Sequence, residues 1–371
     1  MNLLNKTAFC TIVAKNYFGY ARSVAQSLRL KHPESLIFCF LADRIDNKFV
    51  QENEDFILIE SHELGIPNFE SFCFKYDVVE LATAIKPYAM KFILERYNVS
   101  KLIYLDPDIY VFQRLDFIFS LLEDHSIVLT PHITQSFPED GKGMVDQHIL
   151  LAGIYNLGFI GIANTKNTKL FLEWWQHKLY EYCLMDSANG MCVDQKWLDF
   201  APIMFKGVYV MQKDGYNISY WNLHEHKLEY KEGTWYCDNE FLYFYHFSGF
   251  SIKNITIISK YQNRFSLINR PELKPLFEFY KELLLLNRQD ECSKWAYSYG
   301  FYSDGSKIQN HDRKSYYILG INRHEVSSNP FEKKHYLQWK IKSIFFSLRP
   351  YISSNLAKLN FLKVFLKRLK H

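Results

Sequence analysis

The chain has 371 residues, of which 48% are hydrophobic, so it can bury a sizeable core and form one large domain with an appendage, or two domains. Its seven cysteines are odd in number, irregularly spaced and without a CxxC pair, which argues against a disulfide framework and a zinc ribbon and favours thiols in a reducing cytosol. The net charge is +4, but residues 331–371 hold ten Lys or Arg and one acid, so a strongly basic tail follows a mildly acidic body.

Apolar, β-branched runs alternate with segments of helical spacing through the first 270 residues, and this alternation is typical of an α/β domain. The runs predict strands over 8–14, 36–41, 56–59, 101–105, 126–130, 158–162, 205–211 and 241–247. The spacing predicts helices over 20–30, 83–97 and 170–182. The first run is short and is followed at once by polar residues, so it predicts a strand and not a signal peptide. No apolar run reaches the length of about 18 residues that a membrane-spanning helix needs.

Beyond residue 270 the pattern becomes helical and irregular, and residues 271–371 are expected to form a helical C-terminal region. In its basic tail, residues 331–371, leucines and isoleucines recur at helical spacing while Lys358, Lys363 and Lys367 lie off the apolar stripe. This pattern predicts an amphipathic helix on an anionic membrane surface, which would place the protein in the cytoplasm at the inner face of the cell membrane. A terminal helix packed on the body and a dimer seam are the alternatives.

Two carboxylates follow the predicted strand 101–105, in the sequence Asp106-Pro107-Asp108. Pro107 favours an extended conformation at Asp106, and residues two apart point the same way while the chain stays extended. Two hard oxygen ligands at the carboxyl end of a strand suit a divalent cation that also holds phosphates, and open α/β sheets bind ligands at this edge. An ordinary Asp-Pro turn that ends a strand is the alternative.

A second polar segment, from His246 to Lys253, follows the aromatic run 241–245. An imidazole at a strand end can complete an Asp/Asp metal site, Gly249 can let the backbone approach a phosphate, and Lys253 can neutralise a diphosphate. Imidazole, carboxylates and phosphate oxygens together favour Mn²⁺, with Mg²⁺ as the second choice. A core histidine and a surface lysine are the alternatives. No GxxxxGKS/T or GxGxxG motif occurs, which argues against P-loop and Rossmann dinucleotide sites.

An ordered set of short motifs connects these segments. They are Thr11-Ile-Val-Ala14, a helix with Lys86 and Lys91, Tyr104-Leu-Asp-Pro-Asp-Ile109, Tyr155-Asn-Leu-Gly158, Val193-Asp-Gln195 and His246-Phe-Ser-Gly249. Because these motifs occur in this order, the chain resembles bacterial GT-A fold glycosyltransferases, most closely the glycogenin-like family 8 type. The resemblance implies a GT-A, Rossmann-like mixed sheet flanked by helices, in a nucleotide-sugar-binding catalytic domain over residues 1–270, with a C-terminal helical extension.

The resemblance also implies roles for single residues. The metal would be held by Asp106, Asp108 and His246. The nucleotide and its diphosphate would contact Thr11, Val13, Lys86, Asp106, Gly249 and Lys253. The donor sugar and its anomeric carbon would be faced by the catalytic positions Asn156, Asp194 and Gln195. A turn residue is the alternative for Asn156, and a helix N-cap is the alternative for Asp194.

Two departures from the family pattern concern the sugar and the diphosphate. Lys253 stands four residues after Gly249, where the family usually has three. The segment Thr130-Pro131-His132 occurs where an acidic residue often follows the strand after the metal motif, and this departure leaves the identity of the transferred sugar open.

The metal constellation, the resemblance and the basic tail together lead us to expect a metal-dependent glycosyltransferase of bacterial surface polysaccharide or lipopolysaccharide synthesis. It would move a hexose from a nucleotide-sugar to a glycan or lipid-linked acceptor hydroxyl, and the resemblance implies a UDP-sugar as first choice. The resemblance suggests retention; an inverting enzyme would need a base such as Asp194. Nucleic acid is not an expected partner. One alternative is a sugar-phosphate nucleotidyltransferase, although residues 15–20 lack its usual Gly-rich basic loop. The other is a catalytically inactive, membrane-associated binding protein.

Overall fold

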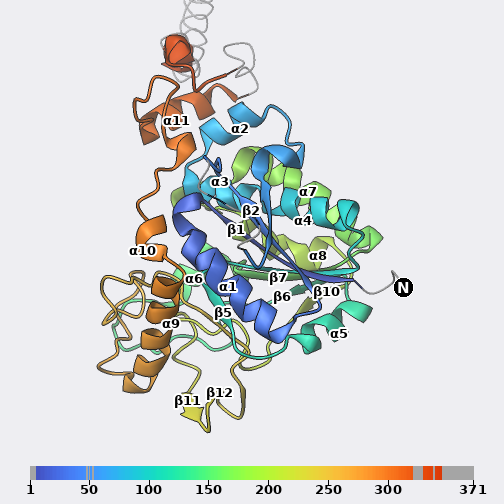
Figure 1. The fold of residues 1–371 in the computed structure, drawn as a ribbon, viewed down its shortest axis with the longest axis vertical. Helices are drawn as coiled ribbons and strands as arrows, with labels where there is room; N and C mark the ends of the chain where they lie inside the picture. Colours follow the sequence, from blue (N-terminus) through green and yellow to red (C-terminus); the bar gives the residue numbers. More distant parts are fainter. Residues whose placement is uncertain are drawn as a thin grey trace, which may run out of the picture. The chain divides into compact units, whose positions relative to one another are not determined.

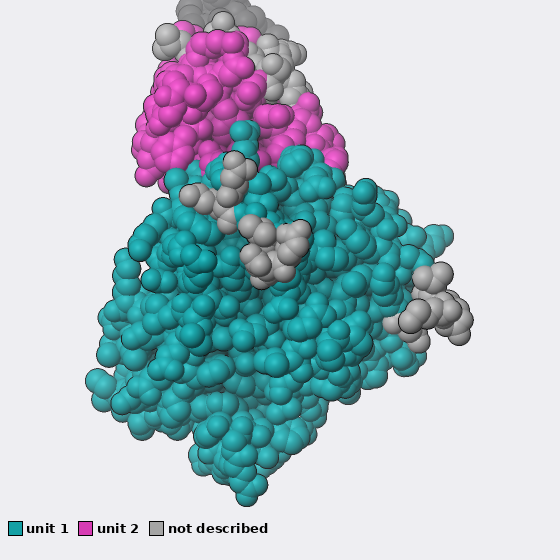
Figure 2. Space-filling view, viewed as in Figure 1, with its two compact units in different colours: residues 1–64, 78–297 teal, residues 65–77, 298–371 magenta. Residues whose placement is uncertain are grey.

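The computed structural model describes residues 6–46, 49, 51, 54–320, 329–336 and 339–344. The chain forms two compact units, one of residues 1–64 and 78–297 and the other of residues 65–77 and 298–371 (Figure 2). The first unit contains every residue that the sequence indicated for the site. The sequence boundary at residue 270 divides the chain differently and stays a prediction.

A seven-stranded sheet forms the centre of the first unit (Figure 1). Its strands are β1 (Thr7–Val13), β2 (Leu36–Leu41), β3 (Ile57–Glu60), β4 (Lys101–Leu105), β6 (Ile127–Leu129), β7 (Phe159–Ala163) and β10 (Val208–Val210). They are arranged in the order β10-β6-β7-β4-β1-β2-β3, in which β7 runs antiparallel to both neighbours and the other pairs are parallel. The mixed α/β sheet predicted from the sequence is therefore confirmed.

Helices cover both faces of this sheet because its strands are apolar on both sides. On one face, Phe9 and Val13 of β1 pack in a core with α1 (Phe18–Lys31) and α5 (Asp116–Asp124). The other face is covered by α4 (Lys86–Arg96). There, Phe40 of β2 contacts Phe92 within α4, and Phe38 of β2 contacts Tyr97, the residue that follows the helix. Helix α7 (Lys166–Tyr182) packs against α4. The sheet is thus a rigid platform between two helical layers.

Smaller sheets extend the first unit beyond this platform. β5 (Ile109–Val111) pairs antiparallel with β14 (Phe244–His246), and β11 (Leu228–Lys231), β12 (Thr234–Cys237) and β13 (Glu240–Phe241) form a three-stranded sheet. The run predicted as one strand over 241–247 is therefore divided between two sheets, with Leu242 and Tyr243 between them. The remaining elements of this unit are α3 (Val78–Ala84), α6 (Asp146–Ala152), β8 (Met185–Asp186), β9 (Met191–Cys192), α8 (Ala201–Met204), α9 (Lys274–Leu286) and α10 (Gln289–Cys292).

The second unit is helical, with α2 (Phe69–Lys75) and α11 (Asn310–Ile318) as its main elements. Its interior holds the guanidinium of Arg313, which donates to the carbonyl oxygens of Phe74, Tyr76 and Tyr299 at 2.6–2.7 Å. Most of the predicted amphipathic tail, residues 345–371, lies outside the described residues. Within the described part of the chain, no helix combines the length and the apolar character needed to span a membrane.

Candidate metal centre

Asp106, Asp108 and His246 come together at the point where three strands end or begin. Asp106 follows β4, Asp108 precedes β5, and His246 is the last residue of β14. Because β14 pairs with β5 in a register that sets His246 opposite Ile109, the imidazole lies beside the carboxylates. Its Nε2 is 2.9 Å from Asp108 Oδ1 and 3.8 Å from Asp106 Oδ2. The convergence that the sequence analysis expected is therefore present in the fold.

The donor set of this cluster suits a divalent cation. One ligand atom from each of the three side chains lies within 4.8 Å of the other two. The two carboxylates are half-buried and His246 is buried. Burial disfavours a charged imidazole, but the negative charges of Asp108 and Asp106 prevail and raise the pKa of His246. The same electrostatic field favours a bound cation, and two oxygens with one imidazole nitrogen suit Mn²⁺ or Mg²⁺.

Gly158 leaves the space that the imidazole occupies. A Cβ atom at this position would lie 2.3 Å from Cε1 and 2.6 Å from Nδ1 of His246. The carbonyl oxygen of Gly158 also accepts a hydrogen bond from the backbone N–H of Asp106 at 2.8 Å. Only glycine lets β7 approach the metal cluster this closely, a requirement that the sequence analysis did not recognise although Gly158 stood in one of its motifs.

A second charged pair lies next to the cluster. Lys86 Nζ is 2.5 Å from Asp194 Oδ2, and it donates to the carbonyl oxygen of Leu157 at 2.8 Å. The ammonium also lies 4.3 Å from the ring centroid of Tyr104, whose hydroxyl donates to Asp106 at 2.6 Å. Burial raises the pKa of Asp194, against the opposing effect of Lys86. Two residues that the resemblance treated separately therefore form one buried ion pair, linked through Tyr104 to a metal ligand.

Asn156 is the centre of a network of uncharged polar side chains. Its Oδ1 accepts from the backbone N–H of Gly158 at 3.1 Å and from Asn217 Nδ2 at 3.0 Å, and its Nδ2 lies 3.2 Å from His132 Nε2. Asn217 Nδ2 also donates to Thr130 at 2.8 Å. All members are buried, and burial lowers the pKa of His132 to about 4, so its ring is neutral at pH 7. The segment Thr130–His132, which departs from the family pattern, therefore belongs to the hydrogen-bond network around the expected site residue Asn156.

The remaining expected site residues have different surroundings. Gln195 donates from Nε2 to the carbonyl oxygen of Ala152 at 3.0 Å. Thr11 is buried in β1, and its hydroxyl has no hydrogen-bond partner among the described residues. The carbonyl oxygen of Val13 accepts from the N–H of Ala42 at 2.8 Å, while its side chain packs in the core beneath α1. β1 and β4 are parallel neighbours, so Thr11 and Val13 lie towards the same sheet edge as Asp106.

The segment after His246 contains the two residues expected at the diphosphate, Gly249 and Lys253. Gly249 has a φ of 74°, and a Cβ atom there would lie 2.5 Å from Ser259 Oγ and 2.7 Å from the ring of Tyr261, so the space beside it is filled by protein. Lys253 is exposed on the following turn, and no contact in the described part of the chain links it to the metal cluster. Its expected role at the diphosphate stays a prediction.

Lys260 is a residue that the sequence analysis did not single out and that contacts the segment after His246. Its backbone N–H donates to the carbonyl oxygen of Gly249 at 3.0 Å. Burial and the charge of Asp108 raise the pKa of Tyr17, and the charge of Lys260 opposes this effect. Tyr17 therefore lies within electrostatic range of both Asp108 and Lys260. The sequence offered no signal for this lysine because a long loop brings it back to Gly249.

No protein-family model matches the chain. Two uncharacterized proteins of Bacillus subtilis (strain 168) are similar in sequence: YfnF is 27% identical over 75% of this chain and 91% of its own length, and YfnD is 26% identical over 66% and 78%.

Solved glycosyltransferase structures are also similar to the chain. The galactosyltransferase LgtC, solved with donor and acceptor sugar analogues, matches 75% of this chain and 95% of its own, with 15% identity and a TM-score of 0.44. The glycosyltransferase GlyE of Streptococcus pneumoniae TIGR4 matches 80% and 67%, with 16% identity and a TM-score of 0.43. Mouse xyloside xylosyltransferase 1 matches 65% and 97%, with 13% identity and a TM-score of 0.37. These three similarities extend over 65–80% of the chain. The strand order of the chain's own sheet shows a mixed α/β fold.

Proposed function

We propose that this protein is a metal-dependent glycosyltransferase that uses a nucleotide-sugar donor. The convergence of Asp106, Asp108 and His246 on one point carries the proposal, because these are the side chains that would hold a divalent cation at a diphosphate. When bound, the cation would stabilise the negative charge that develops on the nucleoside diphosphate as the glycosyl bond breaks. The chain's own residues would position the donor around it.

The buried ion pair supports transfer with retention. An inverting enzyme needs a carboxylate that is free to remove the acceptor proton. Asp194 was the candidate, but its side chain is 3% exposed and is paired with the Lys86 ammonium. A pair held in this way suits a positioning role better than proton transfer. In a retaining reaction, a phosphate oxygen of the donor would accept the proton from the acceptor hydroxyl, and no protein base would be required.

The network of uncharged side chains around Asn156 supports recognition of the donor sugar by neutral hydrogen-bonding groups, without a charged side chain at the contact. Asn156 would face the sugar, with its amide held in place by His132 and Asn217. We propose a UDP-hexose donor and a glycan or lipid-linked acceptor. The remaining parts of the proposal are a base and ribose pocket at Thr11 and Val13, a contact from Gln195 to the sugar, and contacts from Gly249 and Lys253 to the diphosphate.

The basic tail supports a location at the inner face of the cell membrane, where its lysines would meet anionic lipid. Liposome flotation of the full chain and of a chain ending at residue 330 tests this part. We expect the full chain to float with vesicles that contain anionic lipid, and the chain ending at residue 330 not to float. Equal flotation of the two chains, or none, would contradict it.

Donor hydrolysis tests the catalytic proposal. UDP release from UDP-glucose or UDP-galactose should require Mn²⁺ or Mg²⁺, and Asp108→Asn should abolish it because the cation loses a ligand. Asp124→Asn, which changes an exposed carboxylate at the end of α5, is the matched control and should retain full activity. Undiminished turnover by Asp108→Asn would refute the assignment. Pyrophosphate release from UTP and glucose 1-phosphate would indicate a nucleotidyltransferase.

A further inference from the structure

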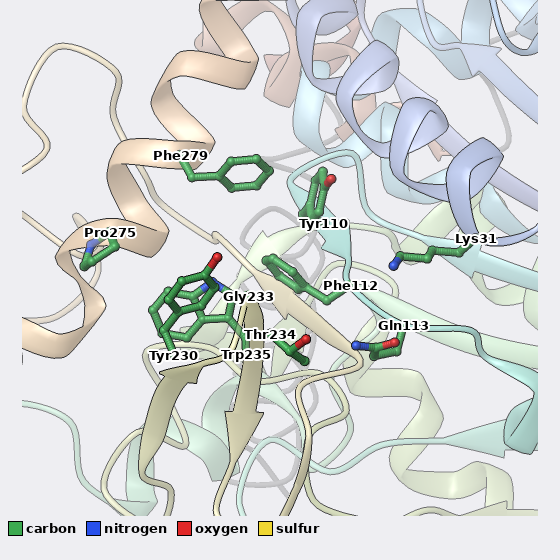
Figure 3. A pocket seen from close by; sticks show the side chains of 10 residues that line it. All are labelled: Lys31, Tyr110, Phe112, Gln113, Tyr230, Gly233, Thr234, Trp235, Pro275 and Phe279. Atoms are coloured by element: carbon green, nitrogen blue, oxygen red, sulfur yellow. The ribbon is translucent and has the colours of Figure 1, made fainter.

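A cavity of about 370 Å³ in the first unit is lined by ten residues, five of which are aromatic. It lies between the end of β5, the turn between β11 and β12, the last residue of α1, and α9 (Figure 3). Its volume falls within the range of about 300–1,000 Å³ that is typical of small-molecule sites. None of its lining residues belongs to the metal cluster or to the neighbouring donor site.

The rings form two groups on different elements. Tyr110, Phe112 and Phe279 contact one another, with centroid distances of 4.8–6.3 Å. Tyr230 and Trp235 form a pair at 5.1 Å across the β11–β12 hairpin. Figure 3 shows Phe279 and Tyr110 above, Tyr230 and Trp235 below, and Phe112 between the two pairs. A flat ligand that enters between them would meet ring faces or edges on both sides.

Two of these rings are exposed to an extent that packing does not explain. Tyr230 is 57% exposed and Phe279 is 40% exposed. Exposed aromatic side chains that gather around one hollow mark binding surfaces more often than chance. The ring groups therefore indicate a ligand with apolar faces.

Polar side chains in the same cavity exclude a purely apolar ligand. The ammonium of Lys31, the side-chain amide of Gln113 and the hydroxyl of Thr234 all line the space. In the part of the chain that the structure describes, none of these three groups has a hydrogen-bond or ion-pair partner within the protein. A lipid chain would cover these polar groups without forming hydrogen bonds to them, which is unfavourable for each group that becomes buried.

We infer that this cavity is a saccharide-binding site separate from the metal centre. The C–H faces of a pyranose ring carry partial positive charge and stack on the negative faces of aromatic rings. Its hydroxyls would accept hydrogen bonds from Lys31 and Gln113 and exchange them with Thr234. The inference goes beyond the proposed catalysis, since it concerns binding alone and does not depend on a functional metal cluster.

Calorimetric titration of the full chain in EDTA tests the inference, with maltohexaose, cellohexaose and chitohexaose as probes. At least one of them should bind without metal or nucleotide. Phe279→Ala, Tyr230→Ala and Gln113→Ala should each weaken binding at least tenfold. Phe241→Ala is the matched control: this ring is 43% exposed and belongs to the same three-stranded sheet as Trp235, but it lies outside the cavity.

The Asp108→Asn variant separates this site from the catalytic one and should bind the saccharide unchanged, even though we expect it to be inactive. Loss of saccharide binding in Asp108→Asn would locate the ligand at the metal centre and overturn the inference. Absence of binding to all three oligosaccharides would also overturn it, as would equal affinities for Phe279→Ala and Phe241→Ala. Circular dichroism of each variant confirms that a weaker titration reflects the cavity and not unfolding.

Discussion

The ammonium of Lys86 and the carboxylate of Asp194 form an ion pair of 2.5 Å in which neither side chain is more than 3% exposed. Lys86 comes from the start of α4, and Asp194 immediately precedes the short helical turn 195–200. Their contact ties the helix that precedes the metal motif to the segment with the expected catalytic residues. Because a buried charge without its partner is costly, this pair couples stability to the geometry of the site.

Lys86→Met should destabilise the fold by about 3–5 kcal/mol, since it leaves the carboxylate of Asp194 buried and unpaired. Adding Asp194→Asn should recover much of this loss, because the double variant contains neither charge. Urea unfolding measures both. Lys91→Met changes a partly exposed lysine of the same helix, 3.7–3.9 Å from two glutamates, and should cost less than about 1 kcal/mol. Equal effects of Lys86→Met and Lys91→Met would contradict this interpretation of the pair.

Gly158→Ala should weaken metal binding. The new methyl group would occupy space within 2.6 Å of two imidazole atoms of His246, so the ring must move away from Asp108. Electron paramagnetic resonance of Mn²⁺ should show at least tenfold weaker binding. Gly161→Ala in β7, three residues further along the chain, is the control, because its nearest contact is a methyl group of Ile118 at 3.2 Å, in the core. Unchanged Mn²⁺ affinity in Gly158→Ala would argue against His246 as a ligand.

Local patterns were sufficient to predict the sheet and the two carboxylates of the metal cluster. The continuous apolar runs that became β1, β2 and β4 had clear ends, and strand ends are where polar side chains gather. Asp106 and Asp108 could be recognised because they follow such a run directly. The position of His246 depends on the pairing of β14 with β5, which only the order of the family motifs suggested.

Contacts between distant uncharged side chains could not be predicted in the same way. The interaction of His132 with Asn156, and that of Asn156 with Asn217, depend on how three loops pack at one edge of the sheet. A buried histidine and two asparagines have no spacing that distinguishes them from turn residues. Conversely, Lys253 had a pattern that suited a diphosphate, yet a one-residue difference in a loop can change where a side chain points. The expected role of Lys253 at the diphosphate is not tested by any contact among the described residues and stays a prediction.

Arg313 offers a test of the second unit by itself. Its guanidinium donates to three carbonyl oxygens of residues 73–76 and to the carbonyl oxygen of Tyr299. Arg313→Lys keeps the charge, but an ammonium group cannot donate to all four carbonyl oxygens as the planar guanidinium does. The local structure of residues 65–77 should therefore unfold transiently more often. Hydrogen exchange in this segment should accelerate by at least tenfold. Lys314→Arg, an exchange of the reverse kind at the next residue, should leave the rate unchanged. Equal protection in both variants would show that the four hydrogen bonds do not hold the segment.

The buried imidazole of His132 should make the fold sensitive to mild acid. Burial lowers its pKa in the folded state from 6.5 to about 4, so between these pH values the unfolded chain binds a proton that the folded chain does not. Stability from this group is complete above pH 6.5 and falls as the pH decreases towards 4, by about 3 kcal/mol in total. Urea unfolding at pH 7 and pH 5 should therefore show a smaller difference for His132→Asn than for the wild type. His177→Asn, at an exposed position of α7, should keep the wild-type difference. If His132→Asn and the wild type lose the same free energy of unfolding between the two pH values, the imidazole is not held neutral by its surroundings.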